Sequence, residues 1–243
     1  MPSRKRKGKA TRKSGPSKSR AALKRSSRKV ARRKPSLLIL ECDSEKLTRQ
    51  SLSVAGELLA AVRVITPQVA TVLVQTTSQN DLLQKLARCK EDHDRFSLIV
   101  VIGHSNSTGI RLTAENGVSW SSFAKWTETF EPKKMVLLAC RAGQMLPAGA
   151  LFDGIPSLDE IYASPTYITK EQCRLVVLLI LYLLGVKSQE PEILRLIQLL
   201  NFMLTLGGVF RWTRKEYRAA GLAEAVEWNL IQHLIDRYGR GGR

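Results

Sequence analysis

The sequence predicts an α/β protein in which a mainly parallel sheet lies between two layers of helices. In residues 36–168, short and almost wholly apolar runs alternate with longer segments of helical spacing, a pattern typical of parallel strands covered on both faces. The 243 residues are 44% hydrophobic, which is enough for one sizeable core. We therefore expect a basic tail over residues 1–35, an α/β core over 36–168 and a helical extension over 169–243 that packs on the core.

The tail differs from the rest of the chain in its charge. Residues 1–35 contain 16 of the 39 Lys and Arg residues and no Asp or Glu, so 16 of the 18 net positive charges fall there and about +2 remains for the body. A segment with so little to bury cannot offset its ordering entropy and is expected to be disordered. It can bind polyanions such as nucleic acid without sequence preference, or it can serve only as a solvated arm.

The first half of the core is predicted to contain two strands, each followed by a helix. The apolar run 36–41 and the β-branched run 70–75 are the strands. Over residues 44–64, apolar residues recur every three or four positions, as on one face of a helix. Asn80 is a suitable N-cap for the second helix.

The second half of the core is predicted to contain a hairpin and three more strands. Asn116-Gly117 favours a tight turn between hairpin strands over 110–112 and 118–120, and a helix follows. Residues 143–157 are rich in small side chains and are expected to be irregular. The three strands are residues 96–102, 134–139 and 160–163.

After residue 169 all the predicted elements are helices. They cover residues 169–184, 191–206 and 215–238, with a break at Gly207-Gly208. The longest unbroken apolar run, residues 175–186, has 12 residues, whereas a membrane-spanning helix needs about 20. We expect buried helices and no membrane span.

The four cysteines, Cys42, Cys89, Cys140 and Cys173, are scattered along the chain. They form no C-x-x-C pair, and no histidine lies at metal-ligand spacing from them, so neither a metal nor an organic cofactor is expected. The tail also lacks the apolar centre of a secretory signal. Together these features favour a reducing, cytoplasmic environment.

Two reactive side chains stand at the ends of predicted strands. His104 follows the strand 96–102 after one glycine, and Cys140 directly follows the strand 134–139. Because function gathers at the carboxyl ends of parallel strands, we expect the two side chains to face one cleft. A neighbouring histidine favours the thiolate and can protonate a leaving amine, so the pair predicts nucleophilic catalysis, with Cys140 as nucleophile and His104 as general acid and base.

Further residues complete the predicted site. The backbone N–H groups of Ser105 and Cys140 are candidates for stabilising an oxyanion. Ser164, after the last core strand, is expected to line the substrate groove. Asp43, just past the first strand, can supply an acidic specificity pocket, although it can equally cap the helix that begins at Ser44.

The residues around His104 and Cys140 also resemble those of a known family. The stretches 98–104 (LIVVIGH), 117–120 (GVSW), 136–143 (VLLACRAG) and 161–164 (IYAS) occur in this order. They resemble the caspase-hemoglobinase fold of cysteine peptidases, and most of all the CHAT-domain branch related to caspases and separase. The resemblance spans residues 36–185. It implies a caspase-like cysteine endopeptidase with a His104–Cys140 dyad that cleaves a protein or peptide substrate.

The same resemblance implies a setting for the activity. CHAT-type proteases often act as effectors in bacterial antiviral defence or in cell death, and a partner or ligand gates them. The apolar helical region after residue 169 is then a candidate surface for a regulatory protein partner.

One departure from the family pattern leaves other functions open. The family usually has glycine directly after the histidine, where this sequence has Ser105; a side chain there restricts the backbone. The alternatives are a catalytically inactive caspase-like scaffold and a nucleic-acid-associated protein that acts through its basic tail.

Overall fold

The computed structural model describes residues 36–42, 53–76, 78–93, 95–112, 117–185, 190–203 and 208–220. The disordered tail expected over residues 1–35 and the candidate pocket residue Asp43 lie outside these ranges.

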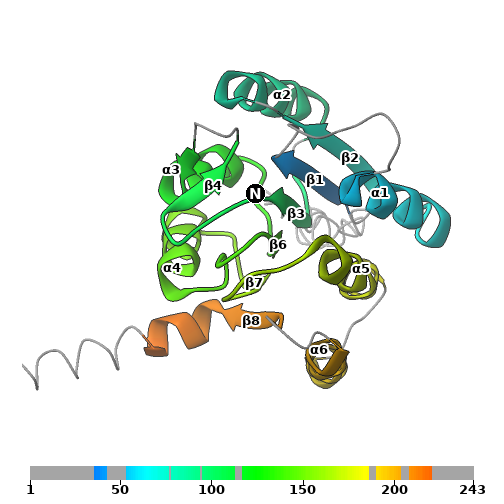
Figure 1. Ribbon diagram of the computed structural model, residues 1–243. Helices are drawn as coiled ribbons and strands as arrows, with labels where there is room; N and C mark the ends of the chain where they lie inside the picture. The colour runs from blue at the N-terminus through cyan, green and yellow to red at the C-terminus, as the bar shows by residue number, and fades with distance from the viewer. Residues whose placement is uncertain are drawn as a thin grey trace, which may run out of the picture. The chain divides into compact units, whose positions relative to one another are not determined.

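A sheet of six strands forms the centre of the fold (Figure 1). The strand order is β2-β1-β3-β6-β7-β8; the first five strands are parallel and β8 is antiparallel to β7. This confirms the predicted α/β class with a mainly parallel sheet. The strands are β1 (Ser36–Cys42), β2 (Ala70–Gln75), β3 (Leu98–Gly103), β6 (Lys134–Leu138), β7 (Glu160–Ala163) and β8 (Phe210–Thr213).

Helices cover both faces of this sheet and give the fold three layers (Figure 1). Side chains alternate along β1, so that Leu38 and Leu40 belong to one hydrophobic cluster and Leu37 and Ile39 to the other, as the two-residue period of a strand requires. The first cluster includes α2 (Gln79–Asp92), α3 (Trp120–Glu128) and α4 (Met145–Gly154). The second includes α1 (Val54–Ile65), α5 (Lys170–Leu184) and α6 (Glu190–Met203).

A Ser or Thr side chain caps the start of α1, α2, α3 and α5. Thr169 and Gln172 form a reciprocal capping box at the start of α5. The second helix, in contrast, is capped by Ser78 and not by Asn80; the Ser78 hydroxyl accepts a hydrogen bond from the Asp81 amide at 3.2 Å.

Two elements differ from the expectation. The segment expected to be irregular contains α4, a helix hidden in the sequence because Pro147 and Gly149 interrupt its pattern and because it is buried on several sides. The part expected to be wholly helical contains β8, which pairs with β7 from Glu160–Thr213 to Ala163–Phe210. The sequence of β8, FRWT, is not an apolar run and lies between two segments of helical spacing, so it was not recognised as a strand.

A separate two-stranded hairpin stands beside the main sheet. It consists of β4 (Gly109–Arg111) and β5 (Gly117–Ser119), paired antiparallel as predicted. Among the described helices, none has the length and hydrophobicity that a membrane crossing demands.

Candidate functional site

The parallel pairing of β3 with β6 brings the stretch that ends in His104 and the stretch that contains Cys140 to one edge of the sheet. The register runs from Leu98–Lys134 to Ile102–Leu138, so both strands end side by side. His104 follows β3 directly, and Cys140 lies two residues beyond β6. The strand order reverses at β1, which has β2 on one side and β3 on the other. Ligands of open α/β sheets bind at the carboxyl ends of the strands where the order reverses.

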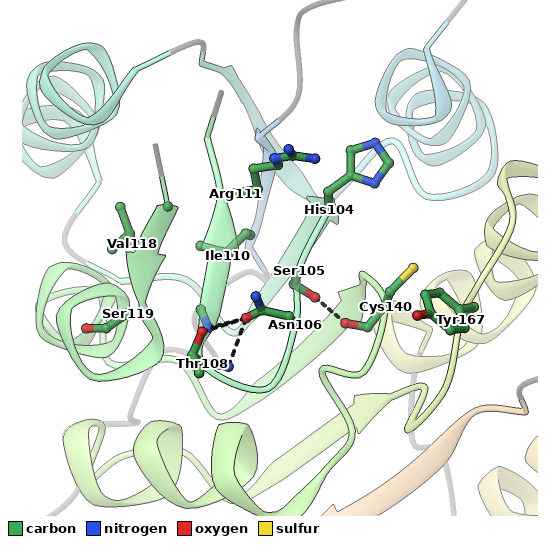
Figure 2. A pocket seen from close by; sticks show the side chains of 12 residues that line it. His104, Ser105, Asn106, Thr108, Ile110, Arg111, Val118, Ser119, Cys140 and Tyr167 are labelled. Carbon is green, nitrogen blue, oxygen red and sulfur yellow. Dashed lines mark hydrogen bonds between the residues drawn. The ribbon is translucent and has the colours of Figure 1, made fainter. Parts of the chain in front are cut away.

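A pocket of about 740 Å³ opens at this edge (Figure 2). His104 and Cys140 both line it, and the Cys140 sulfur points toward the end of the pocket where the His104 ring lies. The other lining residues are Ser105, Asn106, Thr108, Gly109, Ile110, Arg111, Gly117, Val118, Ser119 and Tyr167.

The loop after β3 is folded by its own side chains. The Asn106 side-chain oxygen accepts hydrogen bonds from the amides of Thr108, at 2.9 Å, and Gly109, at 3.0 Å, which is the local turn chemistry that asparagine favours. The chain then returns antiparallel to itself, because the Arg111 amide donates to the His104 carbonyl at 2.8 Å. Exposed His104 and Arg111 are thereby brought to the same wall of the pocket.

The turn that carries Cys140 is bonded to more distant segments. The Arg141 amide donates to the Thr166 carbonyl, and the Gly143 amide donates to the Ser164 carbonyl, each at 2.8 Å. The Trp212 indole of β8 donates to the Gly143 carbonyl at 2.9 Å.

Close approach of the segment after β7 explains the glycine that ends the stretch 136–143 (VLLACRAG). A Cβ atom at Gly143 would lie 2.8 Å from the Ala163 carbonyl oxygen and 2.8 Å from the Ser164 carbonyl carbon. Both are backbone atoms, so the site admits only glycine without a shift of the chain. Arg141 has a φ of 58°, a left-handed conformation that is uncommon for a residue with a side chain.

The Cys140 thiol is half-buried, and its sulfur lies 3.9 Å from the Ile168 carbonyl oxygen. The backbone carbonyl oxygen of Cys140 accepts a hydrogen bond of 2.5 Å from the Ser105 hydroxyl. The two blocks of the predicted site are therefore joined by a side-chain hydrogen bond as well as by the β3–β6 pairing.

The amides of Ser105 and Cys140 are available at this edge. Neither backbone N–H donates a hydrogen bond to another of the described residues. Free donors beside a nucleophile are what an oxyanion needs. The serine in place of glycine therefore retains the donor that the prediction requires.

The remaining candidate residues are placed differently. Ser164 is fully buried, and its hydroxyl accepts a hydrogen bond from the Thr166 amide at 3.3 Å, so it lies behind the pocket and outside its lining. Tyr167, three residues further on, is 67% exposed and lines the pocket. This loop has no periodic pattern in the sequence, which is why Tyr167 was not expected.

Arg141 and Tyr167 form an exposed pair beside the thiol. The Arg141 guanidinium carbon lies 4.9 Å from the centre of the Tyr167 ring, and an Arg141 nitrogen donates to the Tyr167 hydroxyl at 2.9 Å. Stacking on an aromatic ring stabilises a cation, so the pair fixes one rim of the pocket.

Two of the other cysteines, Cys173 and Cys89, have raised pKa values. Burial, together with the nearby Cys140 and Glu171, raises the pKa of Cys173 to about 12. Burial and the charge of Asp92 also raise the pKa of Cys89 above its ordinary value. Because their pKa values are raised, both side chains remain thiols near neutral pH. The thiolate is the reactive form, so neither side chain is activated. Within the described residues, no group of three or more His, Cys, Asp or Glu side chains is arranged to bind a metal.

Comparison with solved structures gives a distant likeness in fold. No family model and no curated protein matches the chain. A solved structure with a similar course is Raptor from Chaetomium thermophilum, at 10% sequence identity and a TM-score of 0.43; the match covers 62% of this chain and 18% of that protein. A likeness this distant says nothing about the chemistry of the pocket.

Proposed function

We propose that this chain is a caspase-like cysteine endopeptidase in which Cys140 and His104 form the catalytic dyad. The observation that supports it most is the common pocket: the imidazole and the thiol follow adjacent parallel strands and line one cavity. Two of the four sequence stretches that resemble CHAT-domain peptidases, 98–104 and 136–143, contain these residues. The distance between a nucleophile and its base is often long without substrate and shortens when substrate binds.

In the proposed reaction, His104 accepts the Cys140 proton and the thiolate attacks the carbonyl carbon of the scissile peptide bond. A carbon–sulfur bond forms and the carbonyl oxygen becomes an oxyanion. His104 then donates its proton to the leaving amine as the carbon–nitrogen bond breaks. Water hydrolyses the resulting thioester, with His104 as the base, and restores the thiol.

The oxyanion would be stabilised by the amides of Ser105 and Cys140. Both belong to residues that line the pocket, and neither donates to another described residue. Such donors lower the barrier because they are already oriented when the charge develops. No step of this reaction draws on a cofactor.

The proposal extends to the cellular role that the resemblance implies, a cytoplasmic effector in antiviral defence or cell death that a partner gates. Exposed leucines on the helical region favour this idea: Leu178 on α5 and Leu194 and Leu199 on α6 are 54%, 43% and 54% exposed. A partner that covers them would bury apolar surface. Asp43 as an acidic specificity residue and residues 1–35 as a polyanion-binding tail belong to the same proposal.

The test is covalent labelling of the full chain with a peptide library that carries an acyloxymethyl ketone. Wild-type protein should be labelled at Cys140, and labelling should be lost in Cys140→Ala and in His104→Ala. Cys89→Ala is the matched control, since Cys89 is also half-buried and free. Labelling that persists in His104→Ala at the wild-type rate would refute the dyad.

A further inference from the structure

The hydrogen bond from Ser105 to Cys140 is the feature of the site that the family pattern does not account for. The Ser105 hydroxyl donates to the Cys140 carbonyl oxygen at 2.5 Å. It joins the loop after β3 to the turn after β6, which are 35 residues apart in the chain (Figure 2). A glycine in this position has no group that can make the bond.

The turn needs such a contact because its other bonds lie on one side. The amides of Arg141 and Gly143 donate to the segment after β7, and the Trp212 indole of β8 donates to the Gly143 carbonyl. These contacts secure the turn from the β7–β8 side of the sheet. The Ser105 hydroxyl bonds it from the β3 side, at the residue that carries the thiol.

The bond also acts on a peptide unit of restricted geometry. The Cys140 carbonyl belongs to the peptide that precedes Arg141, whose φ is 58°. A non-glycine residue remains in this conformation only where its surroundings fix it. Anchoring the Cys140 carbonyl opposes displacement of this turn from the loop after β3, and a displaced turn would carry the thiol away from His104.

We propose that Ser105 is a positioning residue, whose hydroxyl fixes the Cys140 carbonyl and so maintains the thiol in the direction of His104. This inference rests on the proposed peptidase function, because it assigns a role within that site. Ser105 acts through Cys140, and its side chain takes no part in the chemistry. The serine is then a feature of a working site, and the family's glycine would be a loss here.

The test compares Ser105→Ala, Ser105→Gly and Ser105→Thr in two assays on the full chain. The first is the rate constant of Cys140 modification by the peptidyl acyloxymethyl ketone, measured from pH 5 to 9. The second is modification of Cys140 by iodoacetamide, a small reagent that needs no catalytic geometry, followed by mass spectrometry. Misplacement of a reacting group by about 1 Å costs on the order of a hundredfold in rate, so a loss of about ten- to a hundredfold is expected with the ketone for Ala and Gly.

Ser105→Thr retains a hydroxyl and should stay within about threefold of wild type, by the same scale of geometric tolerance. Iodoacetamide modification should change far less than ketone labelling in all three variants. The control is Ser97→Ala, at the opposite end of β3 from Ser105. It removes the bond that the Ser97 hydroxyl donates to the Ser36 carbonyl at 2.8 Å and the bond that it accepts from the Ser36 amide at 3.0 Å. It should lower the melting temperature as Ser105→Ala does and leave ketone labelling unchanged.

Three outcomes separate the possibilities. Ketone labelling of Ser105→Gly at or above the wild-type rate would overturn the positioning role and leave the peptidase intact. An equal loss in Ser97→Ala would reduce the effect to general stability and would also overturn it. A wild-type protein that the ketone labels no faster than His104→Ala contradicts the proposed peptidase itself.

Discussion

The two candidate catalytic residues are fixed in different ways. The turn of Cys140 depends on partners far along the chain, through bonds to the segment after β7 and to Trp212 of β8. His104 lies in a loop that Asn106 folds with hydrogen bonds to residues two and three positions away. Cys140 is thus coupled to the tertiary structure of the sheet, whereas His104 is coupled mainly to local turn chemistry. Substitutions that disturb the sheet should therefore affect Cys140 first.

The largest effect is expected from Glu160→Gln, which disrupts the anchor of β8. Glu160 accepts hydrogen bonds from Arg211 at 2.6 Å and from the Tyr162 hydroxyl at 2.7 Å, and Lys134 lies 3.0 Å away. Only 9% of the Arg211 side chain is exposed. Removing one partner of a buried pair costs about 3 kcal/mol or more. Urea unfolding at pH 7 should show this loss, and exposed Glu171→Gln should not.

The same variant tests a pH dependence. Burial alone would raise the pKa of Glu160, but hydrogen bonds from Tyr162, Arg211 and Lys134 outweigh it and bring the pKa below the ordinary value of 4.5. A lowered pKa in the folded state contributes stability that is present above pH 4.5 and is lost as the pH falls below it. Wild-type protein should lose stability along this acid limb, and Glu160→Gln should show a shallower loss. Equal slopes would contradict the assignment.

The second effect is expected at Gly143, on the far side of the Cys140 turn. In Gly143→Ala the new methyl group would meet backbone atoms at 2.8 Å, and overpacking of this kind costs about 2 kcal/mol. Ketone labelling of Cys140 should fall with the stability, because the turn must move. Gly117→Ala is the control: its Cβ would meet only the Ile110 carbonyl oxygen, at 3.5 Å. Normal labelling of Gly143→Ala would show that the turn tolerates displacement.

A smaller effect is expected from Trp212→Phe, which keeps an aromatic ring in β8 but removes the indole donor. The Gly143 carbonyl then loses its bond of 2.9 Å. Leaving a buried acceptor without a partner costs about 1–2 kcal/mol. Ketone labelling should slow while iodoacetamide modification of Cys140 stays similar. Wild-type ketone kinetics in this variant would mean that β8 does not influence the nucleophile.

These contacts also explain how far the sequence could predict the site. The strands β3 and β6 were predictable because their runs are almost wholly apolar, and His104 and Cys140 were found because they follow those runs. Trp212 was not predictable, since β8 lies in a region of helical character and its sequence, FRWT, is not an apolar run. The burial of Ser164 was not predictable either, because position after a strand does not reveal that a side chain is fully buried. The positions of Trp212 and Ser164 depend on contacts between segments far apart in the chain, and a single sequence does not reveal those contacts.

The smallest effect on stability is expected from Asn106→Ala, in the histidine loop. The substitution removes the acceptor for the amides of Thr108 and Gly109, and exposed local bonds of this kind contribute about 0.5 kcal/mol. Asn106→Asp keeps an acceptor in the same place and should behave as wild type. Because His104 belongs to this loop, ketone labelling in Asn106→Ala should nevertheless slow more than the small stability change implies. If labelling and stability changed in proportion here, as they should at Gly143, the histidine loop and the cysteine turn would respond as one unit and the difference between them would disappear.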